Sequence, residues 1–154
     1  MSRAKSHIPE GLQAVIPQLV VADARAFIAF CEAAFGAVTE GIMPGPDGKG
    51  VMHCHLRIGG APIFCSDAVG FAPRTSANLF VYLPDVDAAV KAAVAAGARL
   101  VQPVADMPWG DRWGMLQDPF GNQWQVATHV EDMSPEEMQR RMKAAGPPEE
   151  KASR

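Results

Sequence analysis

The sequence has few cysteines, no long apolar segment and no excess of basic residues. Its 154 residues include three cysteines without Cys-x-x-Cys spacing, which favours buried thiols in a reducing compartment over a disulfide framework. No stretch approaches the roughly 20 apolar residues that span a bilayer, and residues 1–7 lack the apolar segment of a secretory signal. The net charge of −3 makes nucleic acid a poor partner. These absences predict a cytoplasmic globular protein with neither a membrane nor a nucleic acid as partner.

The chain contains an internal repeat. In two segments a short apolar run leads to an aspartate and then to an Ala-rich amphipathic stretch that ends at Gly-Ala. The aspartates are expected to cap helix N-termini, and the glycines to end those helices in the left-handed conformation. The corresponding positions stand 62 and 61 residues apart, Asp23 with Asp85 and Gly36 with Gly97.

A hairpin follows each predicted helix at the same spacing. Alternating segments joined by Gly-containing connections indicate antiparallel strand pairs. One more short strand is expected directly after each helix. Each module is therefore predicted to be βαβββ, with module one at 12–70 and module two at 77–130. The expected strands are 37–43, 51–58 and 61–66 in module one, and 100–104, 112–117 and 123–127 in module two.

The two ends of the sequence differ from the repeat. Residues 1–11 and 147–154 are expected to be disordered because they are polar or rich in proline and charge. A capping box, Ser134 to Glu137, predicts a C-terminal helix within 131–146. Its methionines could pack on a partner or on the same chain.

Paired modules of this pattern resemble the vicinal oxygen chelate superfamily, in its glyoxalase/bleomycin-resistance, PhnB-like branch. The motifs that carry the resemblance are Arg57–Gly60 before Cys65–Ala68, then Pro108–Gly114 and Asp118–Trp124. The resemblance covers about residues 12–130. It implies an α+β fold in which two βαβββ modules form a curved half-barrel pair (the glyoxalase/bleomycin resistance/dioxygenase fold), here followed by the C-terminal helix. It also implies a small-molecule ligand in the concave side of the sheets and a homodimer.

Strand alternation separates the two faces of the predicted sheets, because successive side chains point to opposite faces. In the segment 51–58, Met52, Cys54, Leu56 and Ile58 form an apolar face that is expected to meet the helix. The opposite, mixed faces are expected to line one ligand pocket. Its predicted members are His53, His55, Arg57, Phe64, Ser66, Asn78, Tyr82 and Gln125.

Enzymes of the superfamily hold a divalent metal with His, Gln or Glu from the strands of both modules. The matching positions here are Ile16, Phe64, Asn78 and Gln125. Two hydrocarbon side chains cannot ligate, and neutral amides alone hold a divalent ion poorly. The sequence therefore predicts a metal-independent, small-molecule-binding protein with no cofactor and no metal ligands.

An alternative is an enzyme that uses His53 and His55 as its catalytic residues. Side chains at i and i+2 of a strand share a face, so the pair could grip one divalent metal with a third ligand such as Asp67, Asp111 or His129. The imidazoles could instead act as general acid or base. They could also be half-exposed polar residues without a role in binding.

The segment 109–113 supplies two further ligand-binding candidates, Trp109 and Arg112. An indole and a guanidinium at the mouth of the cavity could stack on a planar or cationic ligand. The structural alternative is that Trp113 fills core space while Asp111 pairs with Arg112 or another neighbour.

Overall fold

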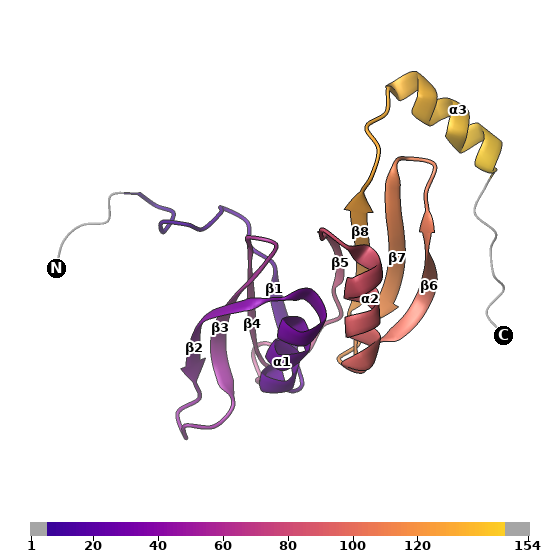
Figure 1. The fold of residues 1–154 in the computed structure, drawn as a ribbon. Coiled ribbons are helices and arrows are strands. Elements are labelled where there is room, and N and C mark those ends of the chain that lie inside the picture. Colours follow the sequence, from indigo (N-terminus) through magenta and orange to yellow (C-terminus); the bar gives the residue numbers. More distant parts are fainter. Residues whose placement is uncertain (1–5, 147–154) are drawn as a thin grey trace.

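The computed structural model describes residues 6–146 and contains two similar units in sequence order. Each unit forms its own four-stranded sheet, ordered β1-β4-β3-β2 and β5-β8-β7-β6 (Figure 1). The elements are β1 (Gln18–Val21), α1 (Ala24–Phe35), β2 (Val38–Pro44), β3 (Val51–Ile58), β4 (Ala61–Asp67), β5 (Asn78–Tyr82), α2 (Val86–Ala95), β6 (Arg99–Asp106), β7 (Asp111–Gln117), β8 (Gln123–His129) and α3 (Pro135–Ala145).

The two sheets have the same topology, which confirms the predicted pair of βαβββ modules. In each sheet the first strand runs parallel to the last strand of its module, β1 with β4 and β5 with β8, and the remaining pairs are antiparallel. A helix lies across one face of each sheet (Figure 1). The sheets are not closed into a barrel, so each keeps a face that no helix of its own module covers. The α+β class and the half-barrel pair are confirmed.

The predicted aspartates begin the first two helices, and the predicted glycine ends α1, whereas α2 ends at the cap residue Ala96, one residue before Gly97. Asp23 Oδ1 accepts a hydrogen bond from the Ala26 amide at 2.9 Å, and Asp85 Oδ1 accepts one from Ala88 at 3.0 Å. Each carboxylate satisfies a donor that the first helical turn leaves free. Gly36 ends α1 with φ of +64°, a conformation that only glycine adopts without strain.

One hydrophobic core joins the modules. It forms where α1, α2 and the helix-covered faces of both sheets meet. Phe27 and Phe35 of α1 contact Trp124 of β8, with ring centroids 6.5 and 4.6 Å apart. Phe27 also packs edge-on against Phe120 at 5.5 Å. Because α1 fills space in module two as well as in module one, the repeat is one folding unit.

The predicted apolar face of β3 is wrong at Met52. Cys54, Leu56 and Ile58 are buried beneath α1 as expected, but Met52 is 53% exposed and Val51 takes the buried position. The register passes from Met43 opposite His53 to Pro44 opposite Val51, so a bulge at Met52 breaks the alternation there. The bulge turns Met52 out of the core.

The helix α3 follows β8 and stands away from both sheets (Figure 1). Ser134 caps it as predicted, and none of its residues is buried. Within residues 6–146, no helix is both long and apolar enough to cross a bilayer. Residues 6–11 contain no helix or strand. The predicted disorder at 1–5 and 147–154 lies outside the described residues.

Candidate functional site

Each sheet presents the face that its helix does not cover, here called the open face. The strand register places His53, His55, Arg57, Phe64 and Ser66 on the open face of module one. It places Asn78, Phe80, Tyr82, Asp111, Trp113, Gln125 and His129 on the open face of module two. The predicted ligand-binding residues are therefore divided between two surfaces of the chain.

Both candidate catalytic histidines pack against Phe64. Its ring centroid lies 4.6 Å from that of His53 and 5.2 Å from that of His55, in edge-on geometry. His55 and Phe64 are directly opposite in the β3–β4 ladder, which forces this contact. A hydrocarbon ring thus occupies the position beside the two imidazoles from which a third metal ligand would come.

Glu40 of β2 connects His55 with Arg57. The His55 Nε2 atom lies 3.1 Å from Glu40 Oε2, but their alignment does not meet hydrogen-bond geometry, so this buried nitrogen has no hydrogen-bond partner within residues 6–146. Arg57 donates to Glu40, to the Gly60 carbonyl and to the Gly11 carbonyl. Its guanidinium therefore holds residue 11 against the sheet. Because these hydrogen bonds use its N–H groups, few donors remain for a ligand.

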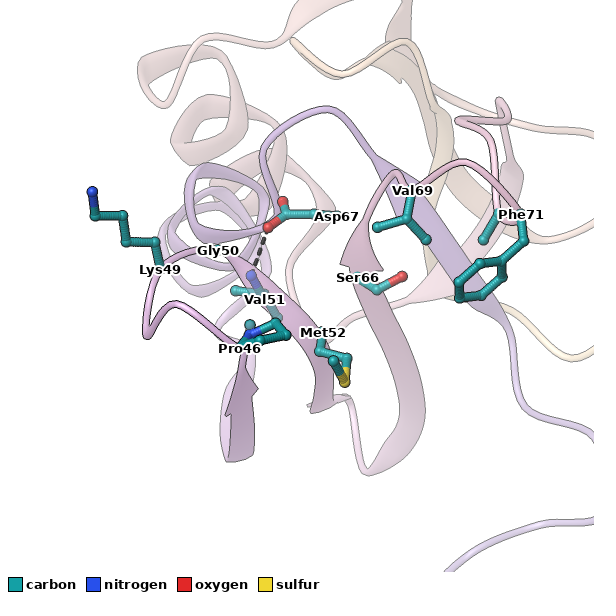
Figure 2. A pocket seen from close by; sticks show the side chains of 11 residues that line it. Pro46, Lys49, Gly50, Val51, Met52, Ser66, Asp67, Val69 and Phe71 are labelled. Atoms are coloured by element: carbon teal, nitrogen blue, oxygen red, sulfur yellow. Dashed lines mark hydrogen bonds between the residues drawn. The ribbon is translucent and has the colours of Figure 1, made fainter.

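A pocket of about 440 Å³ opens at the end of the module-one sheet (Figure 2). Its wall is mainly apolar, and Ser66 is the predicted ligand-binding residue that lines it. Val69 and Phe71 stand at its rim and are 48% and 93% exposed. Met52, which the bulge directs outward, completes the apolar wall. The pocket lies between the β2–β3 connection and the segment that follows β4.

Asp67 is one of the candidate third metal ligands, and both of its carboxylate oxygens accept hydrogen bonds from backbone amides. Its Oδ1 accepts from the Ala24 amide at 2.7 Å and its Oδ2 from the Val51 amide at 2.6 Å (Figure 2). These bonds fix the start of α1 and of β3 against the end of β4. Asp67 also lines the pocket.

The residues at the four family ligand positions do not fit a divalent metal. Ile16 and Phe64 carry no donor atom, and the Gln125 amide nitrogen faces Asn78 Oδ1 at 3.4 Å. Within residues 6–146, no group of three or more His, Cys, Asp and Glu side chains is placed to hold a metal ion. The chemistry of this donor set therefore offers no metal centre at the expected place.

Asp111 is the centre of a polar cluster on the open face of module two. Its carboxylate is 4% exposed and accepts three hydrogen bonds. The donors are Tyr82 Oη at 2.9 Å, Trp109 Nε1 at 3.0 Å and His129 Nδ1 at 2.8 Å. The contact with this carboxylate raises the pKa of the Tyr82 hydroxyl. The cluster joins β5, β7 and the end of β8.

His129 lies between two carboxylates. Its Nδ1 contacts Asp111 and its Nε2 lies 3.0 Å from Asp132 Oδ1, while the side chain remains 52% exposed. The hydrogen bonds to Asp111 and then to Asp132 raise the pKa of His129 above its ordinary value. Both nitrogens can donate only in the imidazolium form, so this geometry favours the cation.

Aromatic rings surround this cluster. Phe80 and Tyr82 have centroids 5.1 Å apart and are 47% and 57% exposed. Trp109 and Trp113 are 6.3 Å apart in edge-on geometry. The buried Trp113 Nε1 has no hydrogen-bond partner within the described residues. The structural alternative, in which Trp113 fills core space, does not hold, because Trp113 lies on the open face of module two and outside the hydrophobic core.

Arg112 lies on the other side of the same sheet. Its guanidinium pairs with Asp87 of α2 at 2.7 Å and with Asp106 of β6 at 3.0 Å, and these carboxylates raise its pKa. It therefore does not share a surface with Trp113, and Asp111 does not pair with it. The expectation that the Arg112 guanidinium stacks on the same ligand as the indole is corrected by strand alternation, which the sequence argument did not apply to this segment.

Four pockets within residues 6–146 contain Ser66 or Phe80 but neither candidate histidine, nor Asn78, Tyr82 or Gln125. Sequence reasoning considered His129 only as a metal ligand, and Asp111 as a metal ligand or as a partner of Arg112 or another neighbour. Alternation counted from Gln125 to His129 would have placed that histidine on the open face.

Comparison with known proteins agrees with this architecture. Residues 12–126 match the model of the Glyoxalase/Bleomycin resistance protein/Dioxygenase superfamily. An uncharacterised protein of Mycobacterium tuberculosis is 38% identical over 144 residues, which cover 86% of this chain and 84% of that protein. The chain therefore belongs to the Glyoxalase/Bleomycin resistance protein/Dioxygenase superfamily.

Solved structures give the same result at the level of the fold. TioX from Micromonospora sp. ML1 is 27% identical, with a TM-score of 0.64 over 77% of this chain and 99% of that one. A PhnB protein from Bacillus cereus is 19% identical, with a TM-score of 0.62 over 75% and 99% of the two chains. PhnB-like proteins are thus among its structural neighbours.

Proposed function

We propose that the protein binds a small molecule without a metal ion. The observation that carries this proposal is the position of Phe64, whose ring lies against both His53 and His55 where a third ligand would be needed. The paired amides of Asn78 and Gln125 at the other family positions support it. Neutral amide and hydrocarbon groups recognise organic molecules better than they hold divalent cations.

The pocket beside Ser66 supplies room for such a ligand. Its volume of about 440 Å³ is in the range of small-molecule pockets, which are mostly apolar with few polar groups. The exposed rim at Val69 and Phe71 offers apolar surface that a ligand would cover.

Metal analysis tests this proposal together with ligand binding. Protein purified without chelator is expected to contain no stoichiometric Ni, Zn, Mn or Fe by plasma mass spectrometry. The dye N-phenyl-1-naphthylamine, which is aromatic and uncharged, is expected to bind equally with and without EDTA. Stoichiometric metal that disappears in His53→Ala would overturn metal independence, and absence of dye binding would count against small-molecule binding.

A second candidate function is that of an enzyme using His53 and His55. The favouring observation is Glu40, whose carboxylate lies 3.1 Å from His55 Nε2. A carboxylate beside an imidazole orients a general base once the two groups are aligned for a hydrogen bond, an alignment that Glu40 and His55 do not have here. The variant Glu40→Gln separates this candidate from simple binding, because it should leave dye affinity unchanged while it removes any proton transfer by His55. A displaced metal is the other form of this candidate, and the metal analysis above tests it.

We also propose that two copies associate. Both open faces expose a large apolar side chain, Met43 in module one and Phe80 in module two, each about half exposed. A second copy would cover such surface. Sedimentation velocity is expected to give twice the chain mass of 16.4 kDa, and Phe80→Asp is expected to shift the protein toward monomer. Val94→Asp, on the exposed side of α2, is the matched control.

The reducing cytoplasm remains the proposed location. The three cysteines are free and buried, which supports a compartment without disulfide formation.

A further inference from the structure

We infer that His129 is an anion-binding point on the open face of module two, and that the ligand is a planar molecule carrying an acidic group. This inference rests on the proposed small-molecule binding, and it adds a second binding point on module two, apart from the pocket beside Ser66 on module one. It is carried by the Asp111–His129–Asp132 arrangement and by the aromatic rings beside it.

Asp111 holds the imidazole in one orientation. The carboxylate is almost fully buried, and its bond to Nδ1 at 2.8 Å directs Nε2 away from the strand. Tyr82 and Trp109 donate to the same carboxylate and fix it in turn. In the imidazolium form, a ring fixed at Nδ1 presents Nε2–H as a single directed donor.

Asp132 occupies the position that a ligand anion would take. Its carboxylate accepts from Nε2 at 3.0 Å, yet its side chain is fully exposed, and within residues 6–146 this is the one hydrogen bond that the side chain makes. The backbone next to it is held, because the Val130 and Glu131 amides both donate to the Gly110 carbonyl at 3.0 Å. The side chain alone can therefore move aside. An exposed pair of this kind contributes little free energy, so a better-placed anion can displace it.

The charges around His129 are compatible with this exchange. Asp111 on β7 and Asp132 after β8 face the imidazole, and Tyr82 on β5 is neutral. Glu131 is neutralised by Arg141 of α3 at 2.8 Å. Replacing the Asp132 carboxylate by a ligand carboxylate, sulfonate or phosphate leaves the charge in contact with the imidazolium unchanged.

The neighbouring rings provide a surface for the planar part of the ligand. Tyr82 and Trp109 donate to the same Asp111 carboxylate as His129, so their rings lie beside the imidazole, and aromatic faces stack well on planar molecules. The buried Trp113 Nε1 is a donor without an acceptor in the described residues. A ligand acceptor that reached it would remove the free-energy cost of an unpaired buried donor.

Two dyes with the same rings test the inference. The sulfonate dye 1-anilinonaphthalene-8-sulfonate carries a permanent anion, and N-phenyl-1-naphthylamine lacks it. Fluorescence titration of the full chain is expected to show that His129→Gln weakens binding of the sulfonate dye roughly tenfold and leaves the uncharged dye unchanged. His7→Gln, at an exposed histidine before β1, is the matched control. Asp132→Asn is expected to strengthen binding of the sulfonate dye about threefold, because it removes the competing carboxylate.

The pH dependence gives a second readout. Affinity for the sulfonate dye is expected to fall as pH rises through the raised pKa of His129, while affinity for the uncharged dye stays level. Equal binding of both dyes with no effect of His129→Gln overturns the anion point and leaves the proposed binding function standing. Failure of both dyes to bind overturns both.

Discussion

The ring of Phe64 lies 4.6 Å from the imidazole of His53 and 5.2 Å from that of His55. A third imidazole at this position would complete a three-histidine set of the kind that binds zinc. We expect Phe64→His to bind one Zn or Ni ion per chain, measured by equilibrium dialysis and plasma mass spectrometry, and Phe64→Leu to bind none. Equal metal uptake by the wild-type protein would contradict this explanation.

Protonation of His129 is expected to stabilise the fold. Its pKa is raised in the folded state, so the folded state binds the proton more tightly than the unfolded state does. The stabilisation is complete below the unfolded pKa of about 6.5 and is lost as pH rises through the folded value. The melting temperature of the wild type should therefore exceed that of His129→Gln at pH 6, and the difference should shrink by pH 9. A difference that stays constant with pH would contradict this account.

Asp118 is expected to be the most costly aspartate to remove. Its buried carboxylate accepts from the Phe120 and Asn122 amides, from Asn122 Nδ2 and from Trp124 Nε1, all at 2.9 Å. Asp118→Ala leaves these donors unpaired and should lower the free energy of unfolding by about 3 kcal/mol in urea denaturation. Asp85→Ala, which removes an exposed helix cap, should cost about 1 kcal/mol. A similar loss of unfolding free energy in the two variants would contradict the explanation that the buried hydrogen bonds of Asp118 stabilise the fold.

The three cysteines are expected to react slowly in the folded protein. Burial raises the pKa of Cys31, Cys54 and Cys65, which keeps them as thiols, and the thiolate is the reactive form. Ellman's reagent should label all three within minutes in guanidinium and hardly any in buffer. Rapid labelling of native protein would place at least one thiol nearer the surface than the structure does.

Much of the fold could be predicted because local signals agreed with one another. Asp23 and Asp85 mark helix starts by their own side-chain chemistry, and the equal spacing of turns repeats the pattern. The bulge at Met52 could not be predicted, since it arises from pairing with β2 and leaves no mark in the segment itself.

The site was harder to predict than the fold. Alternation placed His53, His55 and Phe64 on one face, as the structure has them. It could not show that the guanidinium of Arg57 is used by the Gly11 carbonyl, because that contact joins residues 46 positions apart. The prediction that the residues of 109–113 act together was also wrong. It placed Arg112 beside Trp113, although adjacent strand residues face opposite ways.

The aromatic contact between α1 and β8 has a consequence for how the chain can come apart. Phe27 and Phe35 complete the interior around Trp124, so neither half retains a finished interior when the other is lost. Unfolding should be a single cooperative event, and a gene cut at the linker should yield halves that are structured only when expressed together. The two modules can therefore differ in sequence, but neither is expected to fold without the other.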